Sequence, residues 1–199
     1  MKKIALLVII SMLLSNCASF STRMIKDKIT KLNQENIQTI EGRYEIACYD
    51  AYYVSSYTKR KIIQNRNTMY PETVNYFTNT IIPRRGNNIN YTVDIKLLSD
   101  TEIQFTYRSK DNIIVQQATL EMKLRKNGMI HLKNVETNTK GIPLIFGNIT
   151  VKKSRIGLRK NKDLIINNVD FNAGGFLILL GDSRRSNDSF YFKRINTSL

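Results

Sequence analysis

The sequence predicts an all-β chain, an antiparallel meander that closes into a barrel of about eight to ten strands. Apolar and polar residues alternate with a period of two from Gly42 onward, short polar connections separate the alternating segments, and the 199 residues contain three prolines. Many short strands without a long helical pattern between them are typical of a meander. Closure into a barrel removes the exposed strand edges that such a sheet would otherwise have.

The clearest strands lie in the middle of the chain. YTVDIKL (91–97) and EIQFTYR (102–108) both alternate, and the polar connection LSDT between them predicts a hairpin. IVQQATLEMKLRK (114–126) alternates in the same way and ends at Asn127-Gly128, two residues that tolerate positive φ and favour a tight turn. MIHLKN (129–134) then predicts the returning strand.

Four later segments complete the predicted meander. They are NITVKKSRIGL (148–158), DLIINNV (163–169), GFLILLG (175–181) and SFYFKRI (189–195), with RKNKD and NAGG as turns. Residues 51–90 are read as a strand, a long loop and another strand. A loop of that length is unusual unless it lies over an opening.

The N-terminal segment differs in character from the rest of the chain. Lys2 and Lys3 precede an apolar run, residues 4–14, that only Ser11 interrupts. As a helix it would be about 17 Å long, against about 30 Å of bilayer hydrocarbon. The pattern predicts a secretory signal peptide over residues 1–16, with a buried core helix as the alternative.

The end of this segment, Leu14-Ser15-Asn16-Cys17, resembles the lipobox of bacterial lipoproteins. The resemblance implies cleavage before Cys17, which would carry a diacylglyceryl thioether and an N-acyl chain. Ala18 stands where an Asp would mark inner-membrane retention, so the outer membrane is favoured. The expected partner is thus a membrane, reached through the lipid anchor on Cys17, and the alternative is a soluble secreted form.

Residues 17–39 are expected to form the lipidated N-terminus and a tether that leads into a short helix. Ile25, Ile29, Leu32 and Asn36 fall at helical spacing, and a helix packed on the main domain is the alternative. The barrel domain would then span residues 40–199.

The net charge indicates which partners to expect, and the cysteine count indicates where Cys48 lies. The net charge of +15 falls to +13 when the two lysines of the signal peptide are removed. A basic surface attracts anionic lipid or acidic glycan, and an envelope location excludes nucleic acid as the expected partner. A solvated, charged surface is the alternative. With Cys17 lipidated, Cys48 has no intramolecular partner and is expected to be buried.

The two ends of the meander resemble the lipocalins. Gly42-Arg43-Tyr44 is similar to the Gly-x-Trp signature of the first lipocalin strand, and FYFKRI (190–195) is similar to the last. The segment 155–182 also resembles the final hairpins of lipocalin-like envelope lipoproteins. The resemblance implies that Arg194 packs on Tyr44 and closes one end of the barrel, that Cys48 points inward, and that the other end is open to a ligand.

Residues that would support catalysis or metal binding do not cluster in the sequence. His131 is the only histidine and, at outward parity, is expected on the surface. Asp94, Glu102 and Glu121 also have outward parity. No metal-ligand spacing, nucleophile elbow or phosphate loop occurs. We therefore expect neither an enzyme nor a metal or other cofactor.

The aromatic residues at inward parity are the candidate ligand contacts: Tyr91, Phe105 and Tyr107. An eight-stranded barrel has room for side chains or for one small ligand. The sequence predicts an outer-membrane-anchored lipoprotein that binds a small hydrophobic or amphiphilic ligand. The alternative is a structural or interaction lipoprotein that docks through loops or a basic surface, where the clusters include Lys152, Lys153 and Arg155.

Overall fold

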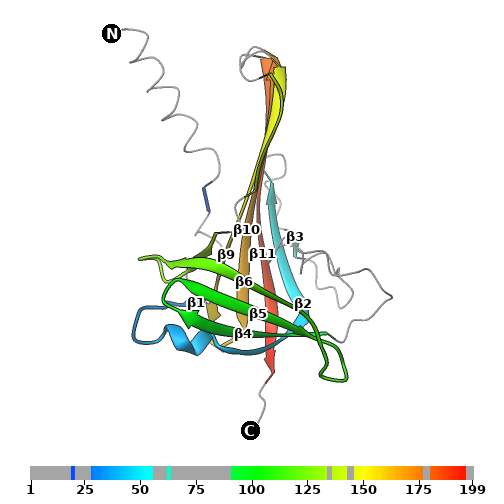
Figure 1. Cartoon of the computed structure of the whole chain (residues 1–199). Helices are drawn as coiled ribbons and strands as arrows, with labels where there is room; N and C mark the ends of the chain where they lie inside the picture. Colours follow the sequence, from blue (N-terminus) through cyan, green and yellow to red (C-terminus); the bar gives the residue numbers. More distant parts are fainter. Residues whose placement is uncertain are drawn as a thin grey trace.

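The computed structural model describes residues 19–20, 28–55, 62–63, 91–133, 136–142, 146–176 and 180–195. Within these residues the chain is almost entirely strand, with a single 3-10 helix (Figure 1). The elements are β1 (Ile29–Thr30), η1 (Ile37–Ile40), β2 (Gly42–Ser55), β3 (Ile62–Ile63), β4 (Thr92–Ser99), β5 (Glu102–Arg108), β6 (Ile114–Leu124), β7 (Ile130–Leu132), β8 (Glu136–Ile142), β9 (Phe146–Arg159), β10 (Leu164–Phe176) and β11 (Leu180–Ile195).

Eight of these strands form a closed antiparallel barrel. Their order is β9-β10-β11-β2-β4-β5-β6-β7, and β7 pairs back with β9 through Ile130–Ile156 and His131–Arg155. Neighbours in the ring follow one another along the chain, apart from the short strand β3 and the β8 hairpin strand. The predicted meander and its closure into a barrel are therefore confirmed.

The turn between β6 and β7 requires its glycine. Gly128 has φ of +79°, a value that L-residues with side chains rarely adopt. A Cβ at this position would also lie 2.7 Å from Cα of Lys31. The Asn-Gly pair thus makes the predicted turn and lets the N-terminal segment pass close to it.

The last hairpin differs from the prediction. NAGG (172–175) was expected to be a turn and GFLILLG (175–181) a separate strand, but β10 continues through Phe176 and β11 begins at Leu180. The ladder runs without a break from Leu164–Phe192 to Phe176–Leu180. Because β9 pairs with β10 on its other side over the same residues, this ladder keeps the glycines within the strand.

The predicted N-terminal helix is reduced to the 3-10 turn η1. Ile29 instead lies in β1, which pairs with the end of β9, and Leu32 is buried at 1% exposure. Pairing with the edge of β9 gives the backbone N–H and C=O groups of residues 29–30 the hydrogen-bond partners that a helix would otherwise supply. Ile25 lies outside the described residues.

Two apolar clusters lie on opposite faces of the barrel wall. The larger one fills the interior and includes Tyr44, Phe105, Ile156 and Phe190. A smaller cluster, formed by Tyr52, Met129, Ile165 and Tyr191, lies on the outer face, where Ile29 of the N-terminal segment packs against it. The N-terminal segment therefore covers one side of the barrel.

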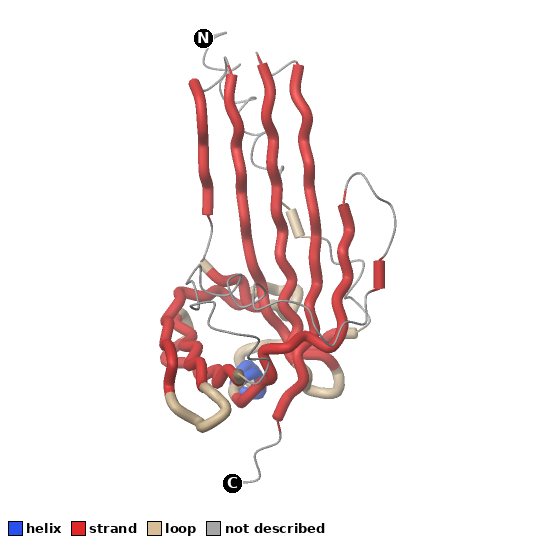
Figure 2. Tube along the Cα trace, turned by 90° about the vertical axis from the view of Figure 1, so that its right-hand side faces the viewer, coloured by secondary structure: helices blue, strands red, loops and turns tan. Residues whose placement is uncertain are grey.

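Three strands of the barrel, β9, β10 and β11, continue well beyond it and form a sheet there together with β8 (Figures 1 and 2). We call this part the extension. It consists of residues 136–142, 146–152, 170–176 and 180–186, which are paired in register across β8, β9, β10 and β11. The extension is thus an ordered ladder that starts where the pairing of β7 with β9 ends.

Candidate functional site: the polar tier of the barrel interior

One end of the barrel is closed by Tyr44 and Arg194, which the structure brings together. Tyr44 is fully buried and its hydroxyl donates to the carbonyl of Ile40 at 2.7 Å. The Arg194 guanidinium lies 5.5 Å from the centre of the Tyr44 ring and donates to the carbonyl of Thr39 at 2.8 Å. Burial raises the pKa of Tyr44 to about 12. We call this end of the barrel, where Tyr44 and Arg194 pack against each other, the closed end.

Glycine at position 42 makes room for this arrangement. A Cβ at Gly42 would lie 2.6 Å from a terminal nitrogen of Arg194. The Gly42-Arg43-Tyr44 signature therefore has a physical reason, because the arginine crosses directly over the start of β2.

The candidate ligand contacts lie in or beside the packed interior. Phe105 and Tyr107 are buried at 0% and 1% exposure and belong to the main core. Tyr91 is half-buried and directly precedes β4. None of the three lines either of the two hollows described below. The role of all three as ligand contacts stays a prediction, and the packing of Phe105 and Tyr107 shows that these two fill the core.

The interior changes from apolar to polar along β9, β10 and β11. Ile166 is paired with Ile156 and Phe190, and all three belong to the interior core. Two residues further toward the extension, the row on the same face consists of Asn168, Ser154 and Asp188. We call this row the polar tier. Because side chains alternate between the two faces of a strand, the polar tier faces the barrel interior.

Two side chains of the polar tier, one buried and one half-buried, have buried polar atoms that lack a partner among the described residues. Asn168 is 5% exposed, and neither atom of its amide has a hydrogen-bond partner there. Oδ1 of Asp188 has none either, while its Oδ2 accepts from the Ser186 hydroxyl at 3.1 Å. Leaving such a group without a partner costs about 1 to 3 kcal/mol. The tier is therefore chemically incomplete without water or a ligand.

A cavity of about 30 Å³ lies at these atoms and is lined by Lys152, Lys153, Ser154, Asn168, Val169, Asp170 and Asp188. That volume is about the space of one water molecule. The cavity offers an amide, a hydroxyl, carboxyl groups and lysines to whatever fills it. It can hold one small polar group that both donates and accepts hydrogen bonds.

The carboxyl group of Asp188 has an altered acidity. Burial raises the pKa of Asp188 to about 6, the Ser186 hydroxyl acts in the opposite direction, and the nearby Asp170 carboxylate raises it further. Asp188 can therefore donate or accept a hydrogen bond at mildly acidic pH. Sequence reasoning missed this residue and Asn168, although extending the alternation of Leu164 and Ile166 by one step places Asn168 at inward parity.

The outer face of the same strands carries a buried arginine. Arg155 is 1% exposed and its Nε donates to Oδ1 of Asn167 at 2.7 Å. The ring of Phe20 lies 4.5 Å from this guanidinium and 4.9 Å from the ring of His131. Burial lowers the pKa of Arg155 to about 10. Arg155 was expected in a basic surface cluster, but it lies beneath the N-terminal segment.

His131 also differs from the prediction. It points outward from the barrel, as its parity indicates, but it is half-buried under Phe20 and not free on the surface. Burial, with the positive charges of Arg155, Arg125 and Lys153, lowers the pKa of His131 to about 4. The neutral imidazole therefore packs here as an aromatic ring.

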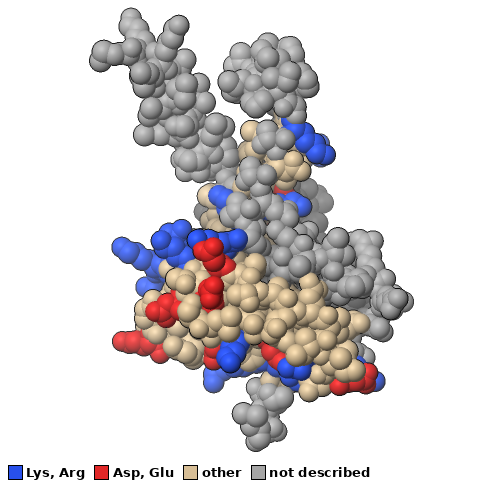
Figure 3. Space-filling view, in the orientation of Figure 1, with Lys and Arg blue, Asp and Glu red and all other residues tan. Residues whose placement is uncertain are grey.

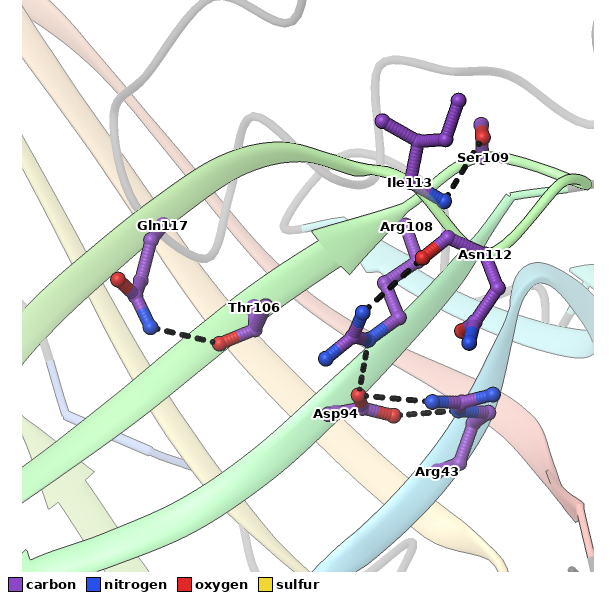
Figure 4. Close-up of polar contacts among 8 residues, drawn as sticks. All are labelled: Arg43, Asp94, Thr106, Arg108, Ser109, Asn112, Ile113 and Gln117. Atoms are coloured by element: carbon purple, nitrogen blue, oxygen red, sulfur yellow. Dashed lines mark hydrogen bonds and ion pairs between the residues drawn. The ribbon is translucent and has the colours of Figure 1, made fainter.

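The carboxylates at outward parity do not converge on a cleft. Asp94 binds Arg43 and Arg108 from the two neighbouring strands, at 2.5 and 2.6 Å (Figure 4). Burial alone would raise the pKa of Asp94, but hydrogen bonds from both arginines hold it below its usual value. Glu102 and Glu121 are exposed. The arrangement joins β2, β4 and β5 and is structural.

An open depression of about 410 Å³ lies at the closed end and is lined by Tyr49, Arg159, Asn161, Asp163, Lys193 and Arg194. Asp163 accepts hydrogen bonds there from the Tyr49 hydroxyl at 2.7 Å and from the backbone N–H of Arg194 at 3.1 Å. Three cations and one carboxyl group therefore face this hollow, which gives it a basic character.

Several expected features lie outside the described residues. These are Cys17, the side chain of Cys48, and the basic clusters 59–61 and 84–85. In the described part of the chain, no helix has the length and apolar character needed to cross a membrane. The same residues contain no group of three or more His, Cys, Asp or Glu side chains placed to hold a metal ion. No protein family, curated protein or solved structure matches this chain.

Proposed function

We propose that this chain is an outer-membrane lipoprotein, anchored through Cys17, whose barrel binds the polar group of a small amphiphilic molecule. The barrel fold is compatible with such binding, and the N-terminal sequence favours the anchor. The observation that carries the ligand proposal is the polar tier, where Asn168 and Asp188 have buried polar atoms that lack partners among the described residues.

The chemistry of the polar tier favours an amphiphile over a purely apolar ligand. The Asn168 amide can donate and accept, and Asp188 accepts when charged and donates when protonated. A hydroxyl or amide head group would satisfy both side chains in place of water. A hydrocarbon would leave them without partners, at a cost of about 1 to 3 kcal/mol for each.

Native mass spectrometry of the protein extracted from envelopes tests the ligand. The wild type is expected to carry a small amphiphile that organic solvent removes and that an added monoacylglycerol, whose head group carries hydroxyls, replaces. Asn168→Leu should lose it. Asn172→Leu is the matched control, because Asn172 lies four residues further along β10 and is exposed. A wild-type protein that carries nothing and takes up no monoacylglycerol would overturn the ligand proposal.

The anchor is tested separately. Cys17→Ser should abolish incorporation of radiolabelled fatty acid, because it removes the thiol that the lipobox resemblance assigns to acylation. The matched control is Cys48→Ser, which should leave labelling unchanged. If labelling of Cys17→Ser equals that of the wild type, the lipoprotein assignment is wrong.

A second function, docking of an acidic envelope component, is favoured by the basic depression at the closed end. Arg159, Lys193 and Arg194 all face it. In this case Lys193→Glu should remove a specific crosslinked partner in intact cells, and Asn168→Leu should leave that partner in place. The two variants thus separate docking from ligand binding.

A further inference from the structure

The basic depression at the closed end is framed by a carboxyl group whose oxygens are already occupied. Asp163 is buried, and its Oδ2 accepts hydrogen bonds from the Tyr49 hydroxyl at 2.7 Å and from the Asn161 amide at 2.6 Å. Its Oδ1 accepts from the backbone N–H of Arg194 at 3.1 Å. These bonds hold the turn between β9 and β10 against β2 and β11. Asp163 therefore builds the depression without forming an ion pair with the cationic side chains that line it.

Arg159, the last residue of β9, is held in place by two tyrosines. Its Nη1 donates to the Tyr49 hydroxyl at 2.7 Å, and its guanidinium lies 5.0 Å from the centre of the Tyr191 ring. Its Nε and Nη2 make no hydrogen bond to the residues that the structure describes. The guanidinium is thus fixed by neutral side chains, and two of its nitrogens can donate to a ligand.

The other two cations of the depression differ in their availability. Lys193 is exposed and has no hydrogen-bond or ion-pair partner in the described part of the chain. Arg194, in contrast, donates through Nη1 to the carbonyl of Thr39 at 2.8 Å and through Nη2 to the carbonyl of Glu41. Arg194 therefore adds positive charge, whereas Arg159 and Lys193 are the side chains that can contact a ligand directly.

Positive charge is not balanced within the depression. Three cations and one carboxyl group line it, which leaves a net charge of +2. Lys160 and Lys162, in the adjoining turn, are exposed. Glu45 and Asp50 of β2 do not line the depression and form no ion pair with its cations. In the face of the barrel seen in Figure 3, acidic side chains lie among the basic ones, so the depression differs from that surface.

This arrangement matches the chemistry of a phosphate group. A guanidinium can bind two phosphate oxygens at once, and an ammonium group binds them as a point charge. A phosphomonoester carries a charge of about −1.5 to −2 at pH 7 and has three acceptor oxygens, whereas a carboxylate carries one charge. The volume of about 410 Å³ lies within the range of roughly 300 to 1,000 Å³ that is usual for small-molecule pockets. The depression thus has room for the phosphate and for a glycerol or sugar attached to it.

We propose that the depression binds a phosphomonoester group, with Arg159 and Lys193 as its direct contacts and with Tyr49 and Asp163 as positioning residues. The inference rests on the second proposed function, docking at the closed end, and names the chemistry that is recognised there. A lipid head group and a soluble sugar or glycerol phosphate share this chemistry.

NMR of the arginine Nε–H signals tests the site directly. Full-length protein in a nonionic detergent is titrated with glycerol 3-phosphate, and the Arg159 signal should shift saturably. Arg43 is the internal control and should not shift, because its Nε is bound to Asp94 at 2.5 Å. Glucuronate, a sugar carboxylate, should bind at least about fivefold more weakly because it carries half the charge or little more. No saturable shift of Arg159, or equal binding of glucuronate, would overturn the proposal.

Calorimetric titration of variants locates the contacts. Arg159→Gln should weaken binding of glycerol 3-phosphate about tenfold or more, and Lys193→Gln at least about threefold. Lys123→Gln is the matched control, because it removes the same charge from an exposed position in β6 and should leave the affinity unchanged. Lys193 is exposed, so its variant decides the question if Arg159→Gln does not fold. Equal effects of Lys193→Gln and Lys123→Gln would show unspecific attraction and refute the site.

Two comparisons identify the source of the phosphate and separate this inference from docking. Lysophosphatidate in the same micelles should shift the Arg159 signal at lower concentration than glycerol 3-phosphate does if the source is a lipid head group, and at equal or higher concentration if it is soluble. If Lys193→Glu removes the crosslinked partner in cells but glycerol 3-phosphate does not bind, docking stands and the phosphate site is wrong. If glycerol 3-phosphate binds but the crosslinked partner persists in Lys193→Glu, docking is wrong and the phosphate site stands.

Discussion

Replacing Asp188 with asparagine should stabilise the protein at neutral pH. The Asp188 carboxyl group lies in the polar tier, and burial raises its pKa from 3.8 to about 6. The folded state therefore holds this proton more tightly than the unfolded state does. Asparagine has nearly the same shape and has no charge to bury, so the variant avoids the cost of ionisation.

The sign and size of the effect follow from the two pKa values. Below pH 3.8 the carboxyl is protonated in both states, and its contribution to stability is fully present. As pH rises toward 6 the unfolded state ionises first, and the wild type loses stability until the folded state ionises as well. A difference of roughly two pKa units corresponds to about 3 kcal/mol.

Urea unfolding of the delipidated wild type and Asp188→Asn, followed by circular dichroism from pH 3.5 to 7.5, measures this directly. The difference in unfolding free energy between the two proteins should grow in favour of the variant from pH 4 to pH 6 and then level off. Comparing the two proteins at each pH cancels the titration of other groups. A difference that is constant across this range, or that grows as pH falls, would refute the burial of Asp188.

Three further predictions concern the wall of the barrel. Asp94→Ala should lower the unfolding free energy at pH 7 by about 1 to 2 kcal/mol, since two arginines lose their partner, and the loss should shrink below about pH 4 because the pKa of Asp94 is lowered. An equal loss at pH 3 and pH 7 would contradict this. Phe20→Ala should raise the pKa of His131 from about 4 toward 6.5, measured by NMR on the only histidine, and an unchanged titration would show that Phe20 does not cover it. Gly128→Ala should cost about 1 to 3 kcal/mol by thermal unfolding because of its positive φ, whereas Gly174→Ala, in a strand, serves as the milder control.

The parts of the fold that follow a local pattern could be predicted from the sequence. Period-two alternation located β4 and β5, and Asn127-Gly128 located the turn before β7. The contact between Tyr44 and Arg194 is also present, since these residues pair across the first and last strands. Each of these features depends on neighbouring residues or on the two ends of a meander.

Features that depend on strand register, or on which segment lies over a given surface, could not be predicted from local sequence patterns. The glycines of residues 172–175 signal a turn by composition, but pairing with β9 and β11 keeps them in β10. Parity placed His131 on the outer face, and the basic cluster with Lys152 and Lys153 placed Arg155 on the surface, but no local pattern shows that Phe20 lies over both. Asn168 is a polar residue among apolar ones, and its burial is visible only when three strands are aligned.

Titration of the protein with a monoacylglycerol, followed by the side-chain amide signal of Asn168 in NMR spectra, tests ligand binding in the polar tier most directly. The side-chain amide signal of Asn168 should show a saturable shift, with no shift at the exposed amides of Asn112 and Asn172. A shift confined to the exposed amides, or no shift of the Asn168 amide at saturating lipid, would contradict it.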